Sequence, residues 1–523
     1  KIGSDILKKG GNAFDAMVAI ELALAVVHPK AGNIGGGGFM IYRLNNGEIG
    51  SLDYREQAPL AAHKDMYLDS LGNVIPGLSE KGVLSVGVPG TIDGILTAHK
   101  RFGKLSLPDL INPAIELSKN GYPLTEYHAK YVNDFQKQLK AHTRYEHEYI
   151  VKDSAFKKGD IIKRPELAET LTRVRDSGRA GFYEGKTAEY IVDEMQAQGG
   201  IITLEDLKTY QAKWRDPISF DYKEYKVTSM SPPSSGGVCL AQILKMVEDK
   251  PLKDYGFHSP EAIQTMIEAE RRAYADRAEF LGDPDFIQVP LNELLDDQYL
   301  KDRMSNFSLE KATKSSDVGH GEITVLQESM ETTHYSIVDA DGNAVSVTTT
   351  LNSNFGSKVM VKGAGFFLNN EMDDFSAKPG VPNLYGLVGN KANAIAPKKR
   401  MLSSMTPTIV EKDGKLFMVV GTPGGSTIIT SVFQTILNVT QFDMGMQEAV
   451  NAPRFHHQWL PDIVAFEPNG FDAEIIKAIE AKGYITNQER MPIIGKVDAI
   501  LVLPDGTLEG GADPRGDDFA SGF

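Results

Sequence analysis

Apolar residues occupy nearly every position between residues 12 and 27, where Asp15 and Glu21 are the exceptions. A helix that is apolar all round is buried rather than laid on a surface. We therefore expect a buried helix over 12–27, which ends at Pro29. The chain then enters a run of four glycines at 35–38.

Alternating apolar and polar positions predict strands on both sides of a long helical stretch. Strands at 39–44 and 49–55 are joined through Asn45-Asn46-Gly47, a strong hairpin signal. Residues 87–330 have mainly helical patterns, with one extended segment at 222–229 and a long helix opened by Ser259-Pro260. Beyond residue 331 we expect strands at 333–338, 344–350, 408–411 and 415–420, helices at 426–442 and 473–482, and a last strand pair around Pro504-Asp505-Gly506.

This order of elements predicts an α+β fold in which antiparallel sheet packs between helical layers. It lacks the regular βαβ alternation of a doubly wound fold. The length of 523 residues alone favours three or four domains, at about 150 residues for each.

Composition excludes several classes of protein. Hydrophobic residues make up 41% and charged residues 24% of the chain, as in a globular protein. The net charge of −15, without any cluster of Lys and Arg, argues against nucleic-acid binding. The longest apolar stretch, at 16–27, contains Glu21 and is shorter than the roughly 20 residues of a membrane span. Cys239 is the only cysteine, which excludes an internal disulfide and directs the search for a nucleophile toward hydroxyl groups.

Four familiar motifs are incomplete or absent. The glycine run leads into a strand without a following Gly-Lys-Ser/Thr, so it predicts a close approach of two backbones rather than a nucleotide site. Ser154-Ala155-Phe156-Lys157 lacks the two partner motifs of the penicillin-binding proteins. No His-Glu-x-x-His and no Gly-x-Ser-x-Gly occurs, so we expect no metal or other cofactor and no Ser-His-Asp hydrolase.

The remaining candidates for chemistry are Arg55 and a set of polar segments in the last third of the chain. Each segment taken alone fits a turn or a helix cap. Together they match a zwitterionic amino acid, with Arg and Ser around its carboxylate and Glu, Asp and Asn around its ammonium group. A Gly-Gly pair beside a helix N-terminus suits an oxyanion. The segments are Thr332-Thr333-His334, Thr350-Leu351-Asn352, Asn369-Asn370-Glu371-Met372-Asp373-Asp374, Leu402-Ser403-Ser404-Met405 and Thr422-Pro423-Gly424-Gly425-Ser426.

Several of these segments, with others, resemble the γ-glutamyltransferase (γ-glutamyltranspeptidase) family in order and over nearly the whole chain. The matching segments are Asp53-Tyr54-Arg55-Glu56, Pro232-Pro233-Ser234-Ser235-Gly236-Gly237, Thr332-Thr333-His334-Tyr335-Ser336, Asn369-Asn370-Glu371-Met372-Asp373-Asp374-Phe375-Ser376, Pro423-Gly424-Gly425-Ser426 and Asn451-Ala452-Pro453-Arg454-Phe455-His456.

The resemblance implies an N-terminal-nucleophile hydrolase, a four-layer αββα sandwich made as an inactive precursor. Cleavage between Glu331 and Thr332 would give a large subunit of 331 residues, 1–331, and a small one of 192 residues, 332–523. The two subunits interleave into one globular unit in such a fold. Cleavage frees the α-amino group of Thr332, whose ordinary pKa of about 8 suits a general base.

The resemblance then assigns the roles of the family's residues to the matching positions of this sequence. Thr332 would attack the γ-glutamyl carbonyl of glutathione or another γ-glutamyl compound, and water, an amino acid or a dipeptide would accept the acyl group. Thr350 would orient Thr332, and Tyr385 would gate the site from a lid loop at 379–386. The resemblance further assigns Gly424 and Gly425 to the oxyanion, Arg55, Ser403 and Ser404 to the substrate carboxylate, and Asn352, Glu371 and Asp374 to its amino group.

Two other functions stay open from the sequence. One is a sibling amidase, such as a cephalosporin acylase or a polyglutamate-cleaving enzyme, and the other is a non-catalytic amino-acid-binding protein. The resemblance implies a periplasmic or secreted protein, although the chain begins at Lys1 without a signal peptide. Members of the family usually carry an extended segment before the helix expected near Ile6, and we expect that segment to be missing here.

Overall fold

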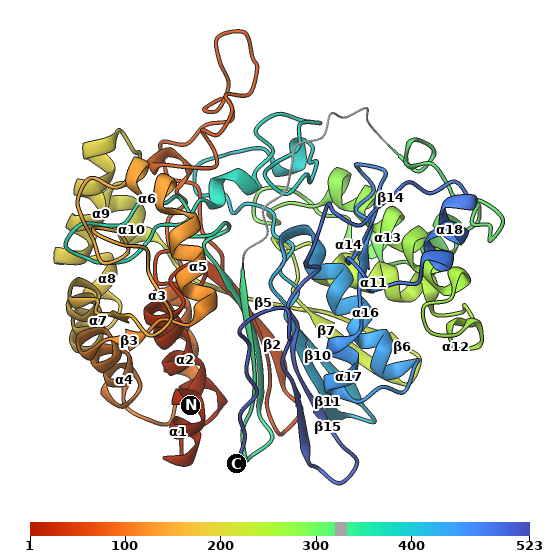
Figure 1. Ribbon diagram of the computed structural model, residues 1–523, viewed down its shortest axis with the longest axis horizontal. Coiled ribbons are helices and arrows are strands. Elements are labelled where there is room, and N and C mark those ends of the chain that lie inside the picture. Colours follow the sequence, from red (N-terminus) through yellow and green to blue (C-terminus); the bar gives the residue numbers. More distant parts are fainter. Residues whose placement is uncertain (320–331) are drawn as a thin grey trace.

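The computed structural model describes residues 1–319 and 332–523, and Figure 1 shows two sheets at its centre with helices on either side. The first sheet has five antiparallel strands in the order β5-β2-β1-β9-β8. Strand β1 lies between β2 and β9, which are far apart in the sequence. The bounds are β1 Gly37–Arg43, β2 Ile49–Tyr54, β5 Lys213–Arg215, β8 Thr333–Val338 and β9 Ala344–Thr350.

The second sheet has six antiparallel strands in the order β16-β15-β11-β10-β7-β6. It also combines distant segments, because β10 pairs with β7 on one side and with β11 on the other. Its strands are β6 Ile218–Tyr222, β7 Tyr225–Ser229, β10 Thr408–Lys412, β11 Lys415–Gly421, β15 Asp498–Val502 and β16 Leu508–Gly511. Two small sheets hold β3 Tyr122–Pro123 with β4 Ile161–Ile162, and β12 Phe455–His456 with β13 Val464–Phe466 and β14 Thr486–Asn487.

The helices form two groups, one outside each large sheet (Figure 1). Beside the first sheet are α1 Ile2–Lys8, α2 Ala13–Val27, α3 Thr91–Phe102, α4 Leu107–Asn120, α5 Glu126–Asp134, α6 Gln136–His142, α7 Pro165–Ser177, α8 Ala180–Tyr183, α9 Gly185–Gln198 and α10 Leu204–Thr209. Beside the second are α11 Gly236–Val247, α12 Leu252–Tyr255, α13 Pro260–Phe280, α14 Leu291–Leu294, α15 Asp297–Arg303, α16 Ile428–Thr440, α17 Met446–Asn451 and α18 Ala473–Ala481.

Alternation along the central strands explains this layering. On β1, Phe39 and Ile41 join a core with Ile409 and Val419 of the second sheet. Met40 and Tyr42 on the same strand instead pack into the core formed with α2, α3 and α4. Successive side chains of a strand point to opposite faces, so each sheet contacts helices on one face and the other sheet on its second face.

The glycine run confirms the expected close approach of backbones. A Cβ atom on Gly35 would lie 2.1 Å from the carbonyl oxygen of Phe367. One on Gly36 would lie 2.0 Å from that of Thr350. Only glycine leaves room for these contacts. The run therefore lets the start of β1 lie against the end of β9, which is where the candidate chemical residues gather.

The extended segment predicted at 222–229 is confirmed over 225–229, which form β7, but its first residues belong to a second strand and a turn. The structure has a hairpin there, β6 and β7, whose turn places Lys223 at a φ of 51°. Neither central turn residue is Gly or Asn, so the turn carries no clear sequence signal. Strand β5 was also missed, because its three residues, Lys-Trp-Arg, are too few to show alternation. The strands predicted at 333–338 and 344–350 are confirmed.

The buried helix expected at 12–27 is confirmed as α2, which Asn12 and Asp15 begin with a reciprocal capping box. Its buried Glu21 accepts hydrogen bonds from Tyr335 Oη at 2.7 Å and Thr349 Oγ1 at 2.9 Å. Burial raises the pKa of Glu21 to about 7, although both hydrogen bonds act in the opposite direction. The carboxyl group therefore costs folding energy wherever it must ionise.

We expect the Glu21→Gln variant to lose part of the pH dependence of stability. Because folding raises the pKa of Glu21, its protonated carboxyl group contributes fully to stability below about pH 4.5. This contribution is lost as the pH rises through about 7. Between pH 5 and pH 8 the wild-type free energy of unfolding should therefore fall by roughly 2–3 kcal/mol more than that of the variant. Urea unfolding at both pH values measures the difference. Glu116→Gln, on the exposed face of α4, should behave like the wild type; equal pH slopes for all three proteins would contradict the assignment.

Candidate active site

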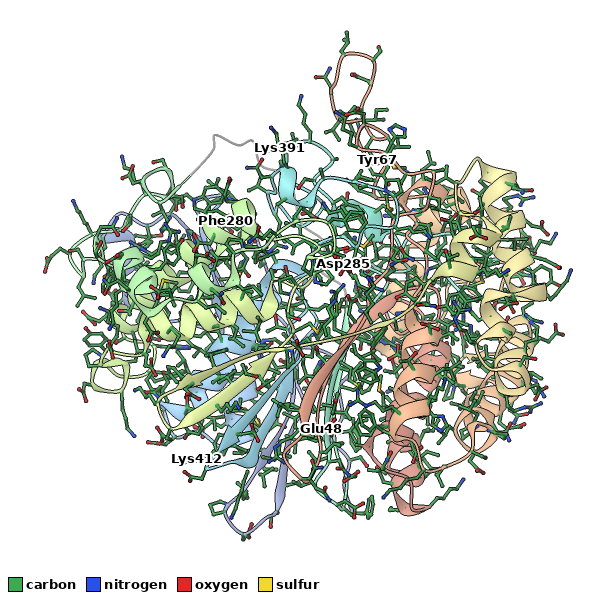
Figure 2. All side chains as sticks on the ribbon, turned by 180° about the vertical axis from the view of Figure 1, so that it is seen from behind. Glu48, Tyr67, Phe280, Asp285, Lys391 and Lys412 are labelled. Carbon is green, nitrogen blue, oxygen red and sulfur yellow. The ribbon has the colours of Figure 1, made fainter. Side chains whose placement is uncertain are left out.

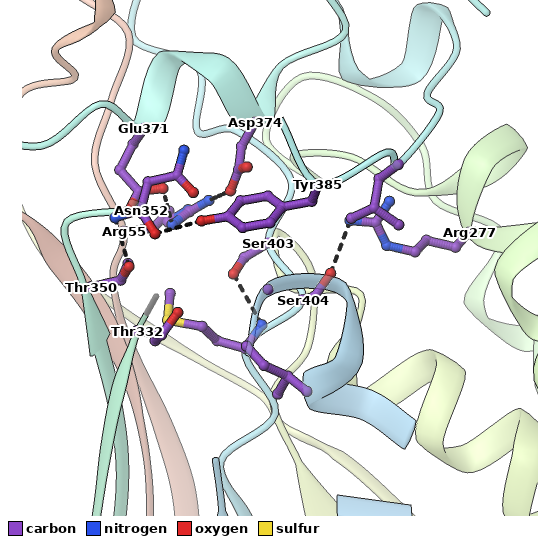
Figure 3. A pocket seen from close by; sticks show the side chains of 14 residues that line it. Arg55, Arg277, Thr332, Thr350, Asn352, Glu371, Asp374, Tyr385, Ser403 and Ser404 are labelled. Carbon is purple, nitrogen blue, oxygen red and sulfur yellow. Dashed lines mark hydrogen bonds and ion pairs between the residues drawn. The ribbon is translucent and has the colours of Figure 1, made fainter. Parts of the chain in front are cut away.

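A small pocket at one end of the two sheets brings together nearly all the residues singled out in the sequence. Figure 2 shows Glu48 and Lys412 at the hairpin ends of the sheets and Asp285 at the other end. Asp285 ion-pairs with Arg215, which also binds Asp53, two residues before Arg55. The pocket is lined by Arg55, Arg277, Thr332, Thr350, Asn352, Glu371, Asp374, Tyr385, Leu387, Ser403, Ser404, Met405, Gly425 and Ile428 (Figure 3).

Strands β8 and β9 place the two threonines of the pocket. Thr333 is opposite Thr349 in the strand register, so Thr332 and Thr350 lie at the same end of the pair. Thr332 immediately precedes β8 and is 5% exposed. Thr350 is the last residue of β9. Its hydroxyl accepts the Asn352 N–H at 2.7 Å and also hydrogen-bonds Glu371. The predicted cleavage point lies before Thr332, but Glu331 is outside the described residues.

Arg55 follows β2 and is surrounded by carboxyl groups. Its Nη1 lies 2.6 Å from Glu371 Oε2 and 3.7 Å from Glu56 Oε2, and its Nη2 forms an ion pair with Asp374. The guanidinium also donates from Nε to the Met401 carbonyl at 3.3 Å. All four charged side chains are buried or nearly so. The sequence placed Arg55 and the two carboxylates around one ligand, and the structure additionally pairs them with each other.

Three carboxyl groups around one guanidinium leave an excess of negative charge. Burial raises the pKa of Glu56 to about 8 and raises that of Glu371 well above its usual range, while Arg55 acts in the opposite direction on both. Burial likewise raises the pKa of Asp374 despite its pairing with Arg55. Carboxyl groups in this state favour the arrival of a cation, because a cation stabilises their ionised form. This side of the pocket therefore suits an ammonium group.

The serine pair lies on the opposite side of the pocket from Glu371 (Figure 3). Ser403 forms a parallel bridge with Ser234, and its carbonyl accepts the Ser235 N–H at 2.8 Å and the Ser235 hydroxyl at 2.7 Å. The Pro-Pro-Ser-Ser-Gly-Gly segment thus holds Ser403 and Ser404 in place. The Ser404 hydroxyl accepts a hydrogen bond from Arg277 Nη2 at 3.1 Å. Hydroxyl groups beside a guanidinium suit a carboxylate.

A turn between β11 and α16 carries the glycine pair. Gly424 has a φ of 143° and Gly425 a φ of 54°, which only glycine adopts readily. Gly425 lines the pocket, and a Cβ atom there would lie 2.5 Å from the Tyr385 ring. Gly424 immediately precedes it, and its carbonyl accepts the Thr427 N–H at 3.0 Å. The turn brings main-chain groups next to the Thr332 side of the pocket.

Tyr385 covers the pocket from a loop that contains the predicted lid at 379–386. Its hydroxyl donates to the Asn352 carbonyl, and its own carbonyl accepts Gln458 Nε2 at 3.3 Å. The Asn352 side chain is held by a 3.0 Å hydrogen bond from Nδ2 to the Asn370 carbonyl. The free volume of the pocket is about 20 Å³, room for about one water molecule. A ligand of amino-acid size needs more space than this, and Tyr385 is one of the side chains that fill it.

Arg277, near the end of α13, is a charged residue of the pocket that the sequence did not predict. It is buried, and its side chain reaches the pocket from the helical layer (Figure 3). The only signal was an arginine in a helix that also holds Arg271 and Arg272, and spacing alone does not separate the three. Leu387, Met405 and Ile428 supply the apolar part of the lining.

Within 1–319 and 332–523, no three His, Cys, Asp or Glu side chains cluster as they would around a metal ion. Over the same ranges, none of the helices is both long enough and apolar enough to cross a bilayer. Cys239 is buried, and burial raises the pKa of its thiol to about 12, so it stays protonated and unreactive at neutral pH.

The chain is similar to known proteins over its whole length. The sequence model of the gamma-glutamyltranspeptidase family matches residues 1–523. The chain is 47% identical to a glutathione hydrolase proenzyme of Escherichia coli over 526 residues, covering 100% of this chain and 90% of that protein. It is 46% identical to the glutathione hydrolase proenzyme of Pseudomonas aeruginosa, covering 99% and 91%.

Solved structures extend the likeness to the fold. A crystal structure of a cephalosporin acylase from Bacillus halodurans superposes with a TM-score of 0.85 at 26% identity, covering 99% of this chain and 92% of that one. A crystal structure of the Helicobacter pylori gamma-glutamyltranspeptidase gives a TM-score of 0.58 at 43% identity, covering 61% of this chain and 91% of that chain. The expected α+β class is thereby confirmed.

Proposed function

The chain belongs to the gamma-glutamyltranspeptidase family, and from this premise we propose that it hydrolyses glutathione with Thr332 as its nucleophile. The resemblance drawn from the sequence is thus confirmed at the level of family and enzyme class. The observation that carries the proposal is the convergence of Thr332, Arg55, Glu371 and Ser404 in one pocket from four separate chain segments. Such a set serves an amino-acid head group beside a hydroxyl nucleophile.

Self-cleavage between Glu331 and Thr332 makes the nucleophile competent in this proposal. As long as the Thr332 nitrogen is an amide, it cannot accept a proton. Once free, the α-amino group can take the proton of the Thr332 hydroxyl as that oxygen attacks the γ-glutamyl carbonyl. The products of processing are the fragments 1–331 and 332–523, and the pairing of β1 with β9 keeps them in one sheet.

The acyl transfer then proceeds in two steps. Thr332 Oγ1 forms an ester with the γ-carbonyl carbon, and the amide bond to the leaving amine breaks as that nitrogen takes up a proton. The N–H groups of Gly424 and Gly425 stabilise the negative charge on the carbonyl oxygen between these events. Water, or the amine of an amino acid or dipeptide, attacks the ester next and releases Thr332. Thr350 keeps the Thr332 end of the strand pair in place.

The two sides of the pocket fix the glutamyl head group. Ser403, Ser404 and Arg55 bind the α-carboxylate, while Asn352, Glu371 and Asp374 bind the α-ammonium group. Charge-assisted hydrogen bonds of this kind are about twice as strong as neutral ones. Tyr385 must swing away for entry, since the free volume of about 20 Å³ admits no glutamyl group. We place the enzyme in the periplasm or outside the cell, where γ-glutamyl compounds such as glutathione would reach it.

We expect Gly425→Ala to lower kcat by about 10²–10³-fold, the usual effect of losing an oxyanion donor. The added Cβ would meet the Tyr385 ring at 2.5 Å, and the φ of 54° is strained for alanine, so the glycine turn or the ring must leave its position. Steady-state hydrolysis of a γ-glutamyl anilide measures the loss. Gly414→Ala is the matched control, because Gly414 also has a positive φ, of 71°, but open space around its Cβ position. An unchanged kcat for Gly425→Ala would remove the glycine pair from the mechanism.

The alternatives are not favoured. The chain is 47% identical to a glutathione hydrolase proenzyme but 26% identical to the cephalosporin acylase. A substrate comparison tests the choice directly: L-γ-glutamyl-p-nitroanilide carries both charged groups, whereas glutaryl-p-nitroanilide lacks the amine. We expect a strong preference for the first substrate. Preference for the glutaryl compound would overturn the proposal in favour of an acylase, and no turnover of either would favour a binding protein.

A further inference from the structure

The Arg277 guanidinium is held by hydroxyl groups rather than by carboxylates. Nε donates to the Ser235 hydroxyl at 2.9 Å, and Nη2 donates to the Ser404 hydroxyl at 3.1 Å. The residue is 5% exposed, and it lines the same pocket as Thr332 (Figure 3). Its helix, α13, lies outside the second sheet, so this side chain enters the site from the helical layer that otherwise contributes only the apolar Ile428 of α16 to the lining.

The charge balance around Arg277 differs from that around Arg55. Arg55 forms ion pairs with Glu371 and Asp374 and has Glu56 within 3.7 Å. In the two described ranges, by contrast, no carboxylate oxygen lies within 4.0 Å of the Arg277 guanidinium nitrogens. Burial lowers the pKa of Arg277, yet a guanidinium remains charged in proteins. The positive charge at this wall of the pocket is therefore not neutralised by direct pairing.

A buried charge without a counter-ion is costly, and such a charge at a binding site is balanced when an anionic ligand arrives. The hydroxyl that Arg277 contacts, Ser404, belongs to the pair proposed to bind the α-carboxylate. Arg55 already forms ion pairs with carboxyl groups. When these groups ionise, their combined negative charge exceeds the single positive charge of Arg55. The unpaired cation nearest to the serine side of the pocket is thus Arg277.

We infer that Arg277 determines specificity for the α-carboxylate: it fixes the Ser404 hydroxyl and supplies, alongside Arg55, the positive charge that the carboxylate meets. This inference rests on the proposed function. It assigns the two charges of the γ-glutamyl group to two walls, with the carboxylate toward α13 and the ammonium group toward Glu371 and Asp374. The competing view is that Arg277 merely ties α13 to the Ser235 and Ser404 loops and has no influence on charge recognition.

Three anilide substrates separate these views. L-γ-Glutamyl-p-nitroanilide has both charges, 4-aminobutyryl-p-nitroanilide lacks the α-carboxylate, and glutaryl-p-nitroanilide lacks the amine. For Arg277→Gln we expect kcat/KM to fall roughly 10- to 100-fold on the two carboxylate-bearing substrates, mainly through KM, as for the loss of a charged hydrogen bond. On the 4-aminobutyryl substrate we expect less than about a threefold change, since no carboxylate contact exists to be lost.

Two further variants keep the test decisive. Arg277→Lys keeps the charge but loses the fork, so it should recover part of the lost kcat/KM on the carboxylate substrates only. It also replaces Arg277→Gln as the readout if the glutamine variant is not processed. Arg272→Lys, on the same helix but paired with Glu268 and absent from the pocket lining, should leave the preference for carboxylate substrates at the wild-type level.

The outcomes distinguish a failure of this inference from a failure of the proposed function. Equal losses on all three substrates, in either Arg277 variant, would show a structural role and overturn the inference while leaving the proposed function intact. If the wild-type enzyme itself turns over the 4-aminobutyryl substrate as well as the γ-glutamyl one, the proposed head-group recognition fails first.

Discussion

Replacing Thr332 with alanine should leave the protein as one uncut chain of 523 residues without hydrolytic activity. The change removes the hydroxyl that we propose attacks both the Glu331–Thr332 bond during processing and the substrate carbonyl during turnover. In that proposal the other polar groups of the pocket bind ligand or position neighbours, so no second hydroxyl takes over both roles. We expect activity to fall to the background of the assay, measured by release of p-nitroaniline, and a denaturing gel to show a single band.

Thr332→Ser is the matched control, because it keeps the hydroxyl and the future α-amino group. It should process, though more slowly, and retain measurable turnover. The account is wrong if Thr332→Ala still divides into two fragments, or if an uncut protein hydrolyses the substrate at the wild-type rate.

Arg55→Lys should lower kcat/KM by about 10²- to 10³-fold. Lysine keeps one charge but cannot contact Glu371 and Asp374 together as the two arms of the guanidinium do. The carboxyl groups that receive the substrate ammonium would then lose their fixed positions. Removing the charge entirely, as in Arg55→Met, should also destabilise the fold by roughly 3–5 kcal/mol, the usual cost of breaking a buried ion pair.

Arg43→Lys controls for the general effect of disturbing a buried arginine. Arg43 pairs with Glu411 at 2.7 Å at the opposite end of β1, away from the pocket. It should lower the unfolding midpoint without changing kcat/KM. Steady-state kinetics and urea unfolding of the processed proteins measure both effects. If Arg43→Lys and Arg55→Lys reduce activity equally, the role of Arg55 in recognition is contradicted.

Sequence patterns located the elements that carry strong local signals. Strands β8 and β9 were predicted at their observed bounds because apolar and polar residues alternate along both. The buried helix α2 was equally clear, because apolar residues fill nearly the whole of 12–27. The β6–β7 hairpin was not, because a turn at Lys223 without glycine depends on tertiary packing rather than on local preference.

The site shows the same division between local and tertiary information. The predicted residues Arg55 and Glu371 do share a pocket, but their direct ion pair joins positions far apart in the sequence and could not be predicted from pattern or motif. Arg277 could not be predicted as a pocket residue, because nothing in the sequence of α13 distinguishes an arginine that faces the pocket from the other arginines of the helix. Motif resemblance predicted which residues belong to the site, whereas the fold was needed to find which of them touch.

Intact-mass spectrometry and N-terminal sequencing of the purified active enzyme test the central claim most directly. The account predicts two fragments in equal amounts, of 331 and 192 residues, with the smaller one beginning Thr-Thr-His-Tyr-Ser at Thr332. It further predicts that brief reaction with a γ-glutamyl substrate adds one γ-glutamyl group to this N-terminal peptide. An active enzyme that remains a single chain, or one whose small fragment begins at any other residue, would contradict it.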